Sequence, residues 1–596
     1  MSIILSALSV ATVSMRMEIL AIPDSFPPIE PVWFLAFCVL AACGWYVLSK
    51  LRVRLLLCGV VFAVIMGIWE ALGYSLELYQ GIYGLVATHD QMVKAALKLI
   101  GTAWIAFVVF VAICLLAGKL QNLKGTIRII SRNRLLFLWP VIFCCWLPYF
   151  FTWYPAIIAF DSAEVVHQAI TGIHERSIPV FHLALTDVFM QNSALSDITS
   201  AAAVYAIFQM AIMSGIFAYA IYKLAGWRIP MPFLVAVAIC FIVVPVYAIF
   251  TITLWKDTLF GGFVLLFVVC VIDFVYTRGE NVKKKSNIVI YIISAIGMLG
   301  FRFNGLHVFI FTVIIIFIAI PFMRKRFALV SAISLALYFL VSSMLVSATG
   351  AYVETGVNSS YAIISIPLQQ IGRIVTLRGD ELLPQEQEFV NELFSKEGDA
   401  PNKDVISTVA QEYDPYLSDN MYLLLNQDWV NQNPGAFFRG WSSLIMKYPS
   451  DATVAVLVNN FGYWWPEESR LGDNFTSGSN AAIQQFGLGA QNYNADDMTI
   501  RSNHMDQLIK FFTATPFGIL FRVSMPAIVC LFLVTFLIYR KQRSELVLLA
   551  PVIGLWLTCL VGPLNAEYRY MFGAFCALPV LIAYYFGKDY SWKNDE

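Results

Sequence analysis

The sequence has few charged residues and no excess of either sign. Asp, Glu, Lys and Arg make up 13% of its 596 residues, and the formal net charge at pH 7 is zero. It contains no long acidic or basic tract, so there is no electrostatic reason to expect a nucleic acid partner. Hydrophobic residues make up 59%, above the roughly 45–50% of soluble domains, and the mean hydropathy is +0.71. This composition predicts a polytopic membrane protein.

The polar parts of the sequence contain no cysteine. All eleven cysteines fall in apolar runs, where a thiol packs as a small hydrophobic group. The longest polar region, 349–515, therefore has no internal disulfide, which favours a bacterial protein if that region faces an oxidising exterior. The N-terminus lacks the basic segment of a cleavable signal peptide. Residues 3–14 are apolar but too short to span a membrane.

Hydrophobic runs long enough to cross a bilayer are frequent. A helix needs about 20 apolar residues to cross a core about 30 Å thick. Lys and Arg cluster after most odd-numbered runs, which places those loops in the cytoplasm and the alternate loops outside. The expected fold class is therefore an all-α polytopic membrane protein with about 13 transmembrane helices. The predicted spans are 31–49, 53–73, 99–118, 135–152, 201–222, 231–250, 258–277, 288–303, 305–321, 327–348, 517–539, 545–561 and 570–587.

The hydrophobic run 288–321 is too long for one span. As a single helix it would extend about 51 Å at 1.5 Å per residue. Both ends are flanked by basic residues, so the run must turn back, and its polar break is Arg302 to Gly305. The same reasoning places Leu254 to Asp257 and Pro563 to Arg569 at outer turns of two other hairpins. Charged residues are thus expected at three outer turns.

Polarity divides the chain into four parts. The third part, an extracytoplasmic and mainly α domain, separates the membrane core from the last spans. The parts are the extra N-terminal spans 1–134, the membrane core 135–348 with its outer loop 153–200, the outer domain 349–516 and the C-terminal spans 517–596.

The outer domain shows helical periodicity followed by an aromatic segment. Apolar spacing predicts a helix lying on the membrane over 360–377 and another helix over 436–459. An aromatic loop is expected over 460–466. Its residue Trp464 is either part of an interfacial anchor or a platform on which a sugar stacks.

The outer loop 153–200 holds the densest set of reactive side chains. It carries the carboxylates Asp161 and Glu164 and three of the six histidines, His167, His174 and His182. The carboxylates have the spacing of a helix capping box, and their mutual repulsion on one helical turn can raise one pKa, which suits proton abstraction. The histidines are candidate general bases, interfacial side chains or metal ligands, although their spacing matches no zinc signature.

Three cations stand in the separate outer turns: Lys256, Arg302 and Arg569. Each alone is typical of a side chain anchored at a helix end. Three of them in hairpins that can converge favour a cradle for a phosphate or diphosphate. The spans carry neither midplane carboxylates nor an internal repeat, which disfavours an ion-coupled transporter. The other candidate binding residues of these turns are Asp257, Asn304 and Glu567.

Six short motifs occur in order along the chain: Tyr154-Pro155 with Phe160-Asp161-Ser162, Trp255-Lys256-Asp257, Arg302-Phe-Asn304-Gly305, Pro367-Leu-Gln-Gln370-Ile-Gly-Arg373, Gly462-Tyr463-Trp464-Trp465-Pro466 and Glu567-Tyr568-Arg569-Tyr570. Together they resemble the DUF6020 group of bacterial polytopic proteins, which is placed with the GT-C glycosyltransferases. The resemblance covers about residues 135–587.

The resemblance implies a GT-C-like core that begins at span 135–152 and a donor sugar carried on a polyprenyl phosphate. By this likeness Asp161 is the catalytic carboxylate and Glu164 a candidate second one. Two residues separate them here, unlike the commoner Asp-Asp, Asp-Glu or Asp-X-Asp forms. The role of Glu164 and a requirement for a divalent cation, Mg²⁺ or Mn²⁺, therefore stay open.

The function expected is that of an inverting membrane glycosyltransferase on the outer side of a bacterial plasma membrane. It would transfer a sugar from a polyprenyl-phosphate donor to a glycan or lipid acceptor of the cell envelope. Asp161 would take the acceptor proton, and Arg302 with Lys256 or Arg569 would hold the lipid phosphate. The alternatives are a flippase or exporter, and a polymerase, of lipid-linked saccharides.

Overall fold

The computed structural model describes residues 1–19, 30–122, 137–158, 160–175, 178–192, 195, 197–351, 361–396, 404–466, 522–562 and 566–588. Within these ranges every regular element is a helix. One isolated parallel bridge, between Ile157 and Thr253, joins two extended segments. The expected all-α class is therefore confirmed for the described part of the chain.

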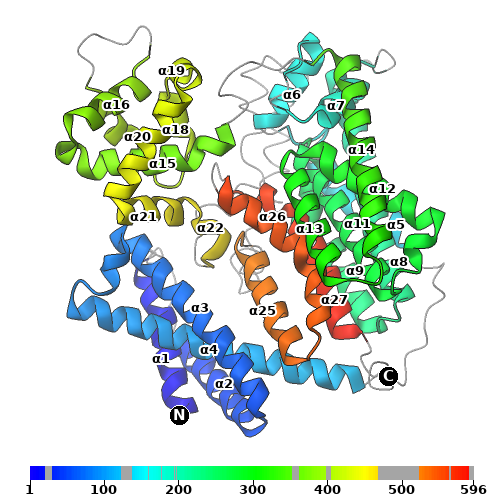
Figure 1. The fold of residues 1–596 in the computed structure, drawn as a ribbon. Coiled ribbons are helices and arrows are strands. Elements are labelled where there is room, and N and C mark those ends of the chain that lie inside the picture. The colour runs from blue at the N-terminus through cyan, green and yellow to red at the C-terminus, as the bar shows by residue number, and fades with distance from the viewer. Residues whose placement is uncertain are drawn as a thin grey trace.

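The N-terminal bundle consists of four helices (Figure 1, blue). Serine and tryptophan side chains fasten the first helix to the last: the Trp104 indole donates to the Ser6 hydroxyl (3.1 Å), and the Ser9 hydroxyl donates to the Gly101 carbonyl (2.9 Å). Polar groups inside an apolar bundle must find such partners. The helices are α1 (Ser2–Ile19), α2 (Glu30–Ser49), α3 (Val53–Tyr79) and α4 (His89–Asn122).

The membrane core is built around α11 and α27, which are more buried than the other long apolar helices. Helices α9 and α10 meet at a bend of 51°, because Pro245 has no N–H with which to continue the α9 ladder. The core helices are α5 (Leu138–Thr152), α8 (Ile198–Gly226), α9 (Met231–Val243), α10 (Pro245–Ile252), α11 (Lys256–Tyr276), α12 (Lys285–Phe301), α13 (Asn304–Ala319), α14 (Arg324–Thr349), α25 (Met525–Tyr539), α26 (Ala550–Val561) and α27 (Tyr568–Gly587).

These helices are those of a multi-pass membrane protein. In the described ranges, seven are long and apolar enough to span a bilayer, or eight if α9 and α10 form one bent span. The remaining predicted spans coincide with shorter apolar helices. The run 288–321 turns back where expected, since α12 ends at Phe301 and α13 begins at Asn304.

The loop 153–200 contains two helices, α6 (Phe160–Thr171) and α7 (Val180–Met190). Gly172 ends α6 with a left-handed φ of 70°, a conformation that glycine adopts without strain. Helix α7 is apolar and packs on α8, α12 and α14. The loop is therefore a folded hairpin on the core rather than a free connection.

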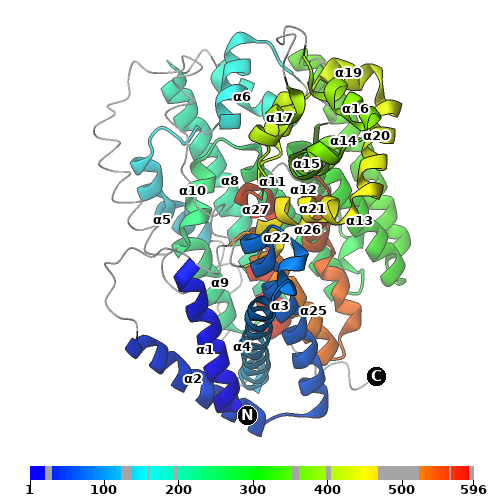
Figure 2. The same ribbon diagram turned by 90° about the vertical axis from the view of Figure 1, so that its left-hand side faces the viewer.

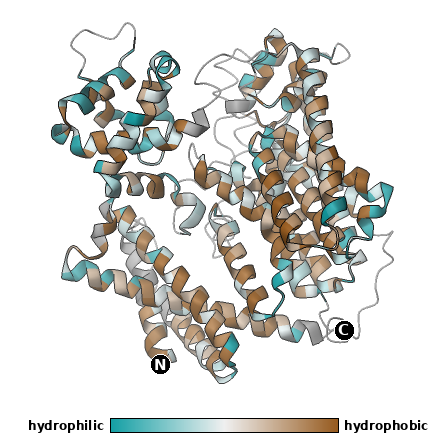
Figure 3. Cartoon of the chain, viewed as in Figure 1, coloured by the Kyte–Doolittle hydropathy of each residue, from teal (hydrophilic) through white to brown (hydrophobic). Residues whose placement is uncertain are grey.

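A helical domain (α15–α22) lies above the N-terminal bundle in Figures 1 and 2 and is more polar than the core (Figure 3). Its centre is α15, whose residues Leu368, Ile371 and Ile374 are buried by the other helices. The helices are α15 (Tyr361–Arg378), α16 (Pro384–Phe394), α17 (Val405–Glu412), α18 (Asp419–Leu424), α19 (Gln427–Gln432), α20 (Pro434–Lys447), α21 (Pro449–Asn459) and α22 (Phe461–Trp464).

Two expectations for this domain were wrong. The apolar face of α15 is covered by protein and not by a membrane surface. The helix expected over 436–459 is two helices, because Pro449 starts a new one at its first position. The aromatic segment 460–466 contains the short helix α22.

Candidate functional site

The three predicted turns meet at the ends of their helices. Asp257, in the first turn of α11, forms an ion pair with Arg302, which follows the last residue of α12. The Arg302 guanidinium carbon lies 4.5 Å from the centre of the Tyr570 ring, and that of Arg569 lies 5.0 Å from the same centre. One aromatic ring of α27 thus carries two cations.

Arg569 is held by three further contacts. It forms an ion pair with Glu567, its Nη2 donates to the Tyr570 hydroxyl (3.2 Å), and its guanidinium carbon lies 5.5 Å from the centre of the Trp255 ring. We call Trp255, Asp257, Arg302, Glu567, Arg569 and Tyr570 the turn cluster. Its members come from three hairpins that are up to about 300 residues apart in sequence.

The charges of the turn cluster are mostly shielded from solvent. Asp257 is 0% exposed and Arg302 is 9% exposed. Burying such a pair is costly unless its polar atoms find partners. Asp257 Oδ1 is paired with Arg302, whereas Oδ2 has no hydrogen-bond partner within the described residues. The buried Asp257–Arg302 ion pair therefore still has one carboxylate oxygen that could accept a hydrogen bond.

Two other predicted residues lie at the same helix ends. Lys256 is the first residue of α11 and Asn304 the first of α13, and both are partly exposed. Sequence reasoning grouped Lys256 with the two arginines. The structure brings Arg302 and Arg569 together on Tyr570.

The α6–α7 hairpin is fastened next to the turn cluster. Ile157 N–H donates to Ile252 O (2.9 Å), and Leu254 N–H donates to Ile157 O (3.1 Å). Asp161 lies four positions after Ile157, and Asp257 lies four positions after Thr253. A four-residue segment reaches at most about 14 Å. Both aspartates are therefore tethered close to one backbone bridge.

Asp161 lies in the first turn of α6, and its side chain is outside the described part of the structure. Glu164 is partly buried and accepts a hydrogen bond from Gln168 Nε2 (3.0 Å). Gln168 Oε1 in turn accepts from Glu175 N–H (3.0 Å). The predicted role of Asp161 stays a prediction, and Glu164 belongs to a hydrogen-bond chain along α6.

The three histidines of this loop have separate surroundings. His174 is buried, and its Nε2 lies 2.8 Å from Asp187 Oδ1. His182 is buried with its Nδ1 3.2 Å from the Tyr205 hydroxyl. His167 is partly exposed on α6. Within the described residues no three His, Cys, Asp or Glu side chains form a group that could hold a metal ion.

The hairpin also contacts the core one residue before Arg302. Phe181, at the start of α7, packs edge-on against Phe301 with ring centres 6.1 Å apart. A Cβ on Gly300 would lie 2.5 Å from the Phe181 ring, so this glycine permits the close approach. The helix that carries His182 is thereby set against the end of α12.

Trp464 is not on an exposed surface. Its ring stacks on Phe461 with centres 5.3 Å apart and an interplanar angle of 18°, and its indole N–H donates to Leu457 O (3.3 Å). It is 7% exposed. This position offers neither a membrane anchor nor an open face for a sugar, because the side chain lies in a cluster formed by its own domain and by Leu76 of α3.

Aromatic members of the site were missed by sequence reasoning. Trp255 and Tyr570 stood within recognised motifs, but only the charges beside them were singled out. Tyr463 on α22 was predicted only as part of the aromatic segment 460–466, and its proximity to the charged turns was missed. Burial raises the pKa of its hydroxyl well above the usual value, and Tyr570 and Glu567 add to that rise while Arg302 opposes it. The sequence did contain a signal for Trp255 and Tyr570, because each directly flanks a charged residue of a turn.

The fold and the turn cluster define a multi-pass helical membrane protein with a buried cation and aromatic site at three helix ends. Residues 180–595 match a family described as a family of unknown function (DUF6020). The match covers more than half of the chain, and the protein belongs to this family. No curated protein and no solved structure matches the chain. The matched residues begin at 180, so Asp161 and Glu164 precede them.

Proposed function

We propose that the protein is a membrane glycosyltransferase that uses a sugar linked to a polyprenyl phosphate. The observation that carries the proposal is the pair of guanidinium groups, from Arg302 and Arg569, on the ring of Tyr570. Arginine offers planar sets of N–H donors that match the oxygens of a phosphate. Two such groups around one ring would together bind a phosphate or a diphosphate.

The place of the cluster supports a lipid-borne anion. Arg302 follows the apolar helix α12, and Arg569 lies in the first turn of the apolar helix α27. A polyprenyl phosphate has an anionic head and a long apolar tail, so its head would lie at these helix ends and its tail along the apolar helices. Hydrogen bonds to an anion are strong where water is largely excluded.

The chemistry follows from this placement. An acceptor hydroxyl oxygen attacks the anomeric carbon of the donor sugar, and the bond from that carbon to the phosphate oxygen breaks. Asp161 takes the hydroxyl proton, and the electron pair leaves with the polyprenyl phosphate. Arg302 and Arg569 stabilise the charge that develops on the leaving phosphate. Attack from the opposite face inverts the configuration.

The proposal extends to a GT-C-like core, a bacterial plasma membrane and a reaction on its outer side. The α15–α22 domain would hold the glycan or lipid acceptor. These points rest on the motif resemblance and on the charge pattern of the loops.

Binding of undecaprenyl phosphate tests the site directly. Native mass spectrometry of the purified protein should show binding that falls about tenfold or more in Arg302→Gln and in Arg569→Gln, because each loses charge-assisted hydrogen bonds. Arg378→Gln is the matched control: Arg378 pairs with Asp451 and Glu381 within the α15–α22 domain. Unchanged binding in both cluster variants contradicts the proposal.

Transfer is tested with radiolabelled polyprenyl-phosphate sugars and membrane acceptors. Asp161→Asn should retain undecaprenyl phosphate binding and lose transfer by about a hundredfold or more. A folded Asp161→Asn variant with full activity removes Asp161 from the mechanism. Movement of the lipid across a vesicle membrane without sugar transfer would instead support an exporter.

A further inference from the structure

The short helix α22 joins three parts of the molecule (Figures 1 and 2). On one side it reaches the N-terminal bundle, where the Trp465 indole N–H donates to Glu70 Oε2 on α3 (3.1 Å). The approach is close: a Cβ on Gly73 would lie 2.3 Å from the Trp465 ring. Only a glycine at that position of α3 admits the indole.

Glu70 is held in place by a buried cation. Lys98 Nζ on α4 lies 3.2 Å from Glu70 Oε1, and the two side chains are 1% and 3% exposed. Lys98 also lies 5.0 Å from the centre of the Tyr74 ring. Both oxygens of Glu70 therefore have a partner, one inside the bundle and one on the segment that follows α22. Breaking such a buried pair on one side is costly.

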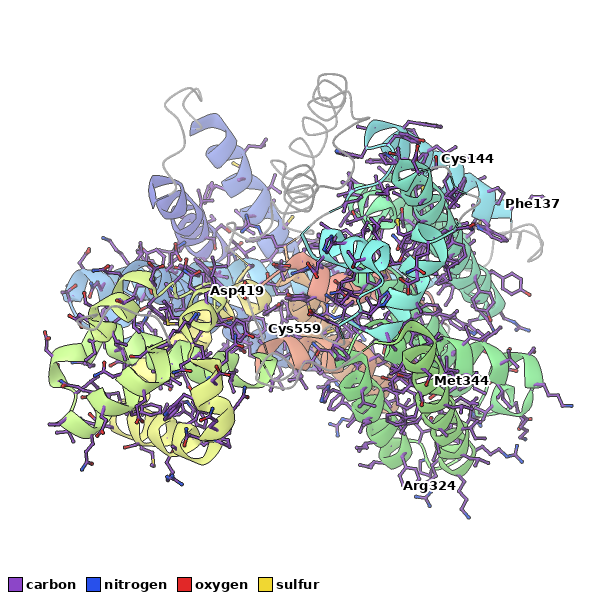
Figure 4. All side chains as sticks on the ribbon, turned by 90° about the horizontal axis from the view of Figure 1, so that it is seen from above. Phe137, Cys144, Arg324, Met344, Asp419 and Cys559 are labelled. Carbon is purple, nitrogen blue, oxygen red and sulfur yellow. The ribbon has the colours of Figure 1, made fainter. Side chains whose placement is uncertain are left out.

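On its other side α22 is fastened to α26. The Trp556 indole N–H donates to Tyr463 O (2.9 Å), and Asn460 Nδ2 donates to Leu560 O (3.2 Å). Helix α26 in turn contacts the turn cluster, because the Cys559 thiol on α26 donates to Tyr570 O (3.9 Å). Seen from above, Cys559 of α26 lies on the side of the core that faces the α15–α22 domain (Figure 4).

A continuous series of contacts thus runs from the N-terminal bundle to the turn cluster. We infer that Glu70, Lys98 and Trp465 are positioning residues, which set the turn cluster through α22 and α26. The bundle precedes the residues that match the family, so it adds a support that the matched part does not contain. The inference goes beyond the proposed function, and only its second test depends on that function.

Hydrogen exchange measures the structural link without a ligand. In Trp465→Phe, which keeps a ring but loses the indole donor, backbone exchange over 566–572 should be about fivefold faster. Glu70→Gln with Lys98→Met, which removes both charges at similar volume, should raise the same exchange. Trp441→Phe is the control, because its indole donates to Gln370 within the α15–α22 domain (2.8 Å).

The affinity for undecaprenyl phosphate is the second measurement. Trp465→Phe should weaken binding about threefold to tenfold, while Trp441→Phe leaves it unchanged. Unchanged exchange over 566–572 in Trp465→Phe overturns the inference, and so does an equal rise in Trp441→Phe. If the double variant fails to fold, Trp465→Phe decides alone. If the unmodified protein does not bind the lipid, the proposed function fails and the exchange result still decides this inference.

Discussion

Helix α11 carries a buried aspartate near each end, and the two differ in how well they are satisfied. Asp273, near the C-terminal end, accepts hydrogen bonds on both carboxylate oxygens. Asp257, near the N-terminal end, pairs through one oxygen with Arg302 and has no hydrogen-bond partner on the other within the described residues. The donors to Asp273 are Lys223 Nζ (3.0 Å), Trp227 Nε1 (2.9 Å) and Asn281 Nδ2 (2.7 Å).

The difference in hydrogen bonding suggests that the two aspartates have different roles. A carboxylate whose oxygens are all partnered has reached its best environment and serves to fix the surrounding helices. A buried carboxylate with an unpartnered oxygen, beside two cations on one ring, keeps interactions in reserve. On the proposed function, we expect the Asp273 end to fix the surrounding helices and the Asp257 end to adjust the strength of anion binding.

The largest expected effect is a loss of protein stability when Asp273 is replaced. Asp273→Ala leaves Lys223 buried without its counter-charge and should lower the free energy of unfolding by about 3–5 kcal/mol. Asp273→Asn, which can still accept a hydrogen bond from Trp227, should cost less. Thermal unfolding of both variants in detergent measures this order. Equal stability of Asp273→Ala and the unmodified protein would remove the distinction between the two ends.

The next effect is on the aromatic ring of the turn cluster. Tyr570→Leu removes the surface on which both guanidinium groups lie, so the affinity for undecaprenyl phosphate should fall about tenfold to thirtyfold. Tyr570→Phe keeps the ring and loses the hydroxyl that accepts from Arg569, and should lose only about threefold. Titration by native mass spectrometry ranks the variants. The reverse ranking would mean that the hydroxyl, and not the ring, organises the cations.

A smaller effect, of opposite sign, is expected at Asp257. Asp257→Asn removes a negative charge beside Arg302, so the cluster becomes more positive and should bind undecaprenyl phosphate about fivefold more tightly. Asp273→Asn at the other end of α11 should leave the affinity unchanged. Weaker binding in Asp257→Asn would show that Asp257 acts by orienting Arg302 rather than by its charge.

The smallest effect concerns a third carboxylate, Asp187, which is partly buried on α7. Burial raises its pKa above the usual value, and the hydrogen bond from His174 only partly opposes that rise. The folded state therefore holds the proton more tightly than the unfolded state. Its contribution to stability is complete below about pH 4, the unfolded value, and is lost as pH rises through the folded-state pKa.

The variant Asp187→Asn isolates this contribution. As pH rises through that window, the unfolding temperature of the unmodified protein should fall relative to that of Asp187→Asn. A difference that is constant with pH would show that Asp187 does not titrate differently on folding.

Much of the fold followed from local hydropathy. The turn at Arg302 was predicted because a run of that length cannot remain one helix inside a bilayer. The role of α15 and the break at Pro449 were not predicted correctly. An apolar stripe does not reveal whether lipid or another helix covers it, and the periodicity of 436–459 continues through the proline.

The site was predicted in part. Charges at separate turns suggested convergence, and the structure joins Arg302 with Arg569. Tyr570 and Trp255 were overlooked because an aromatic residue next to a charge is ordinary at a membrane interface. The enclosure of Trp464 by Phe461 could not be foreseen, since exposure depends on the packing of the whole domain.

The sequence by itself determined that this is a helical, multi-pass membrane protein with charges gathered at hairpin turns. These properties depend on runs of apolar residues and on the lengths needed to cross a bilayer, both of which are local. Tertiary structure alone decided which turns meet, that Tyr570 carries two cations, and that Glu70 and Lys98 support α22. Such contacts join residues hundreds of positions apart, and only the packing of complete helices brings them together.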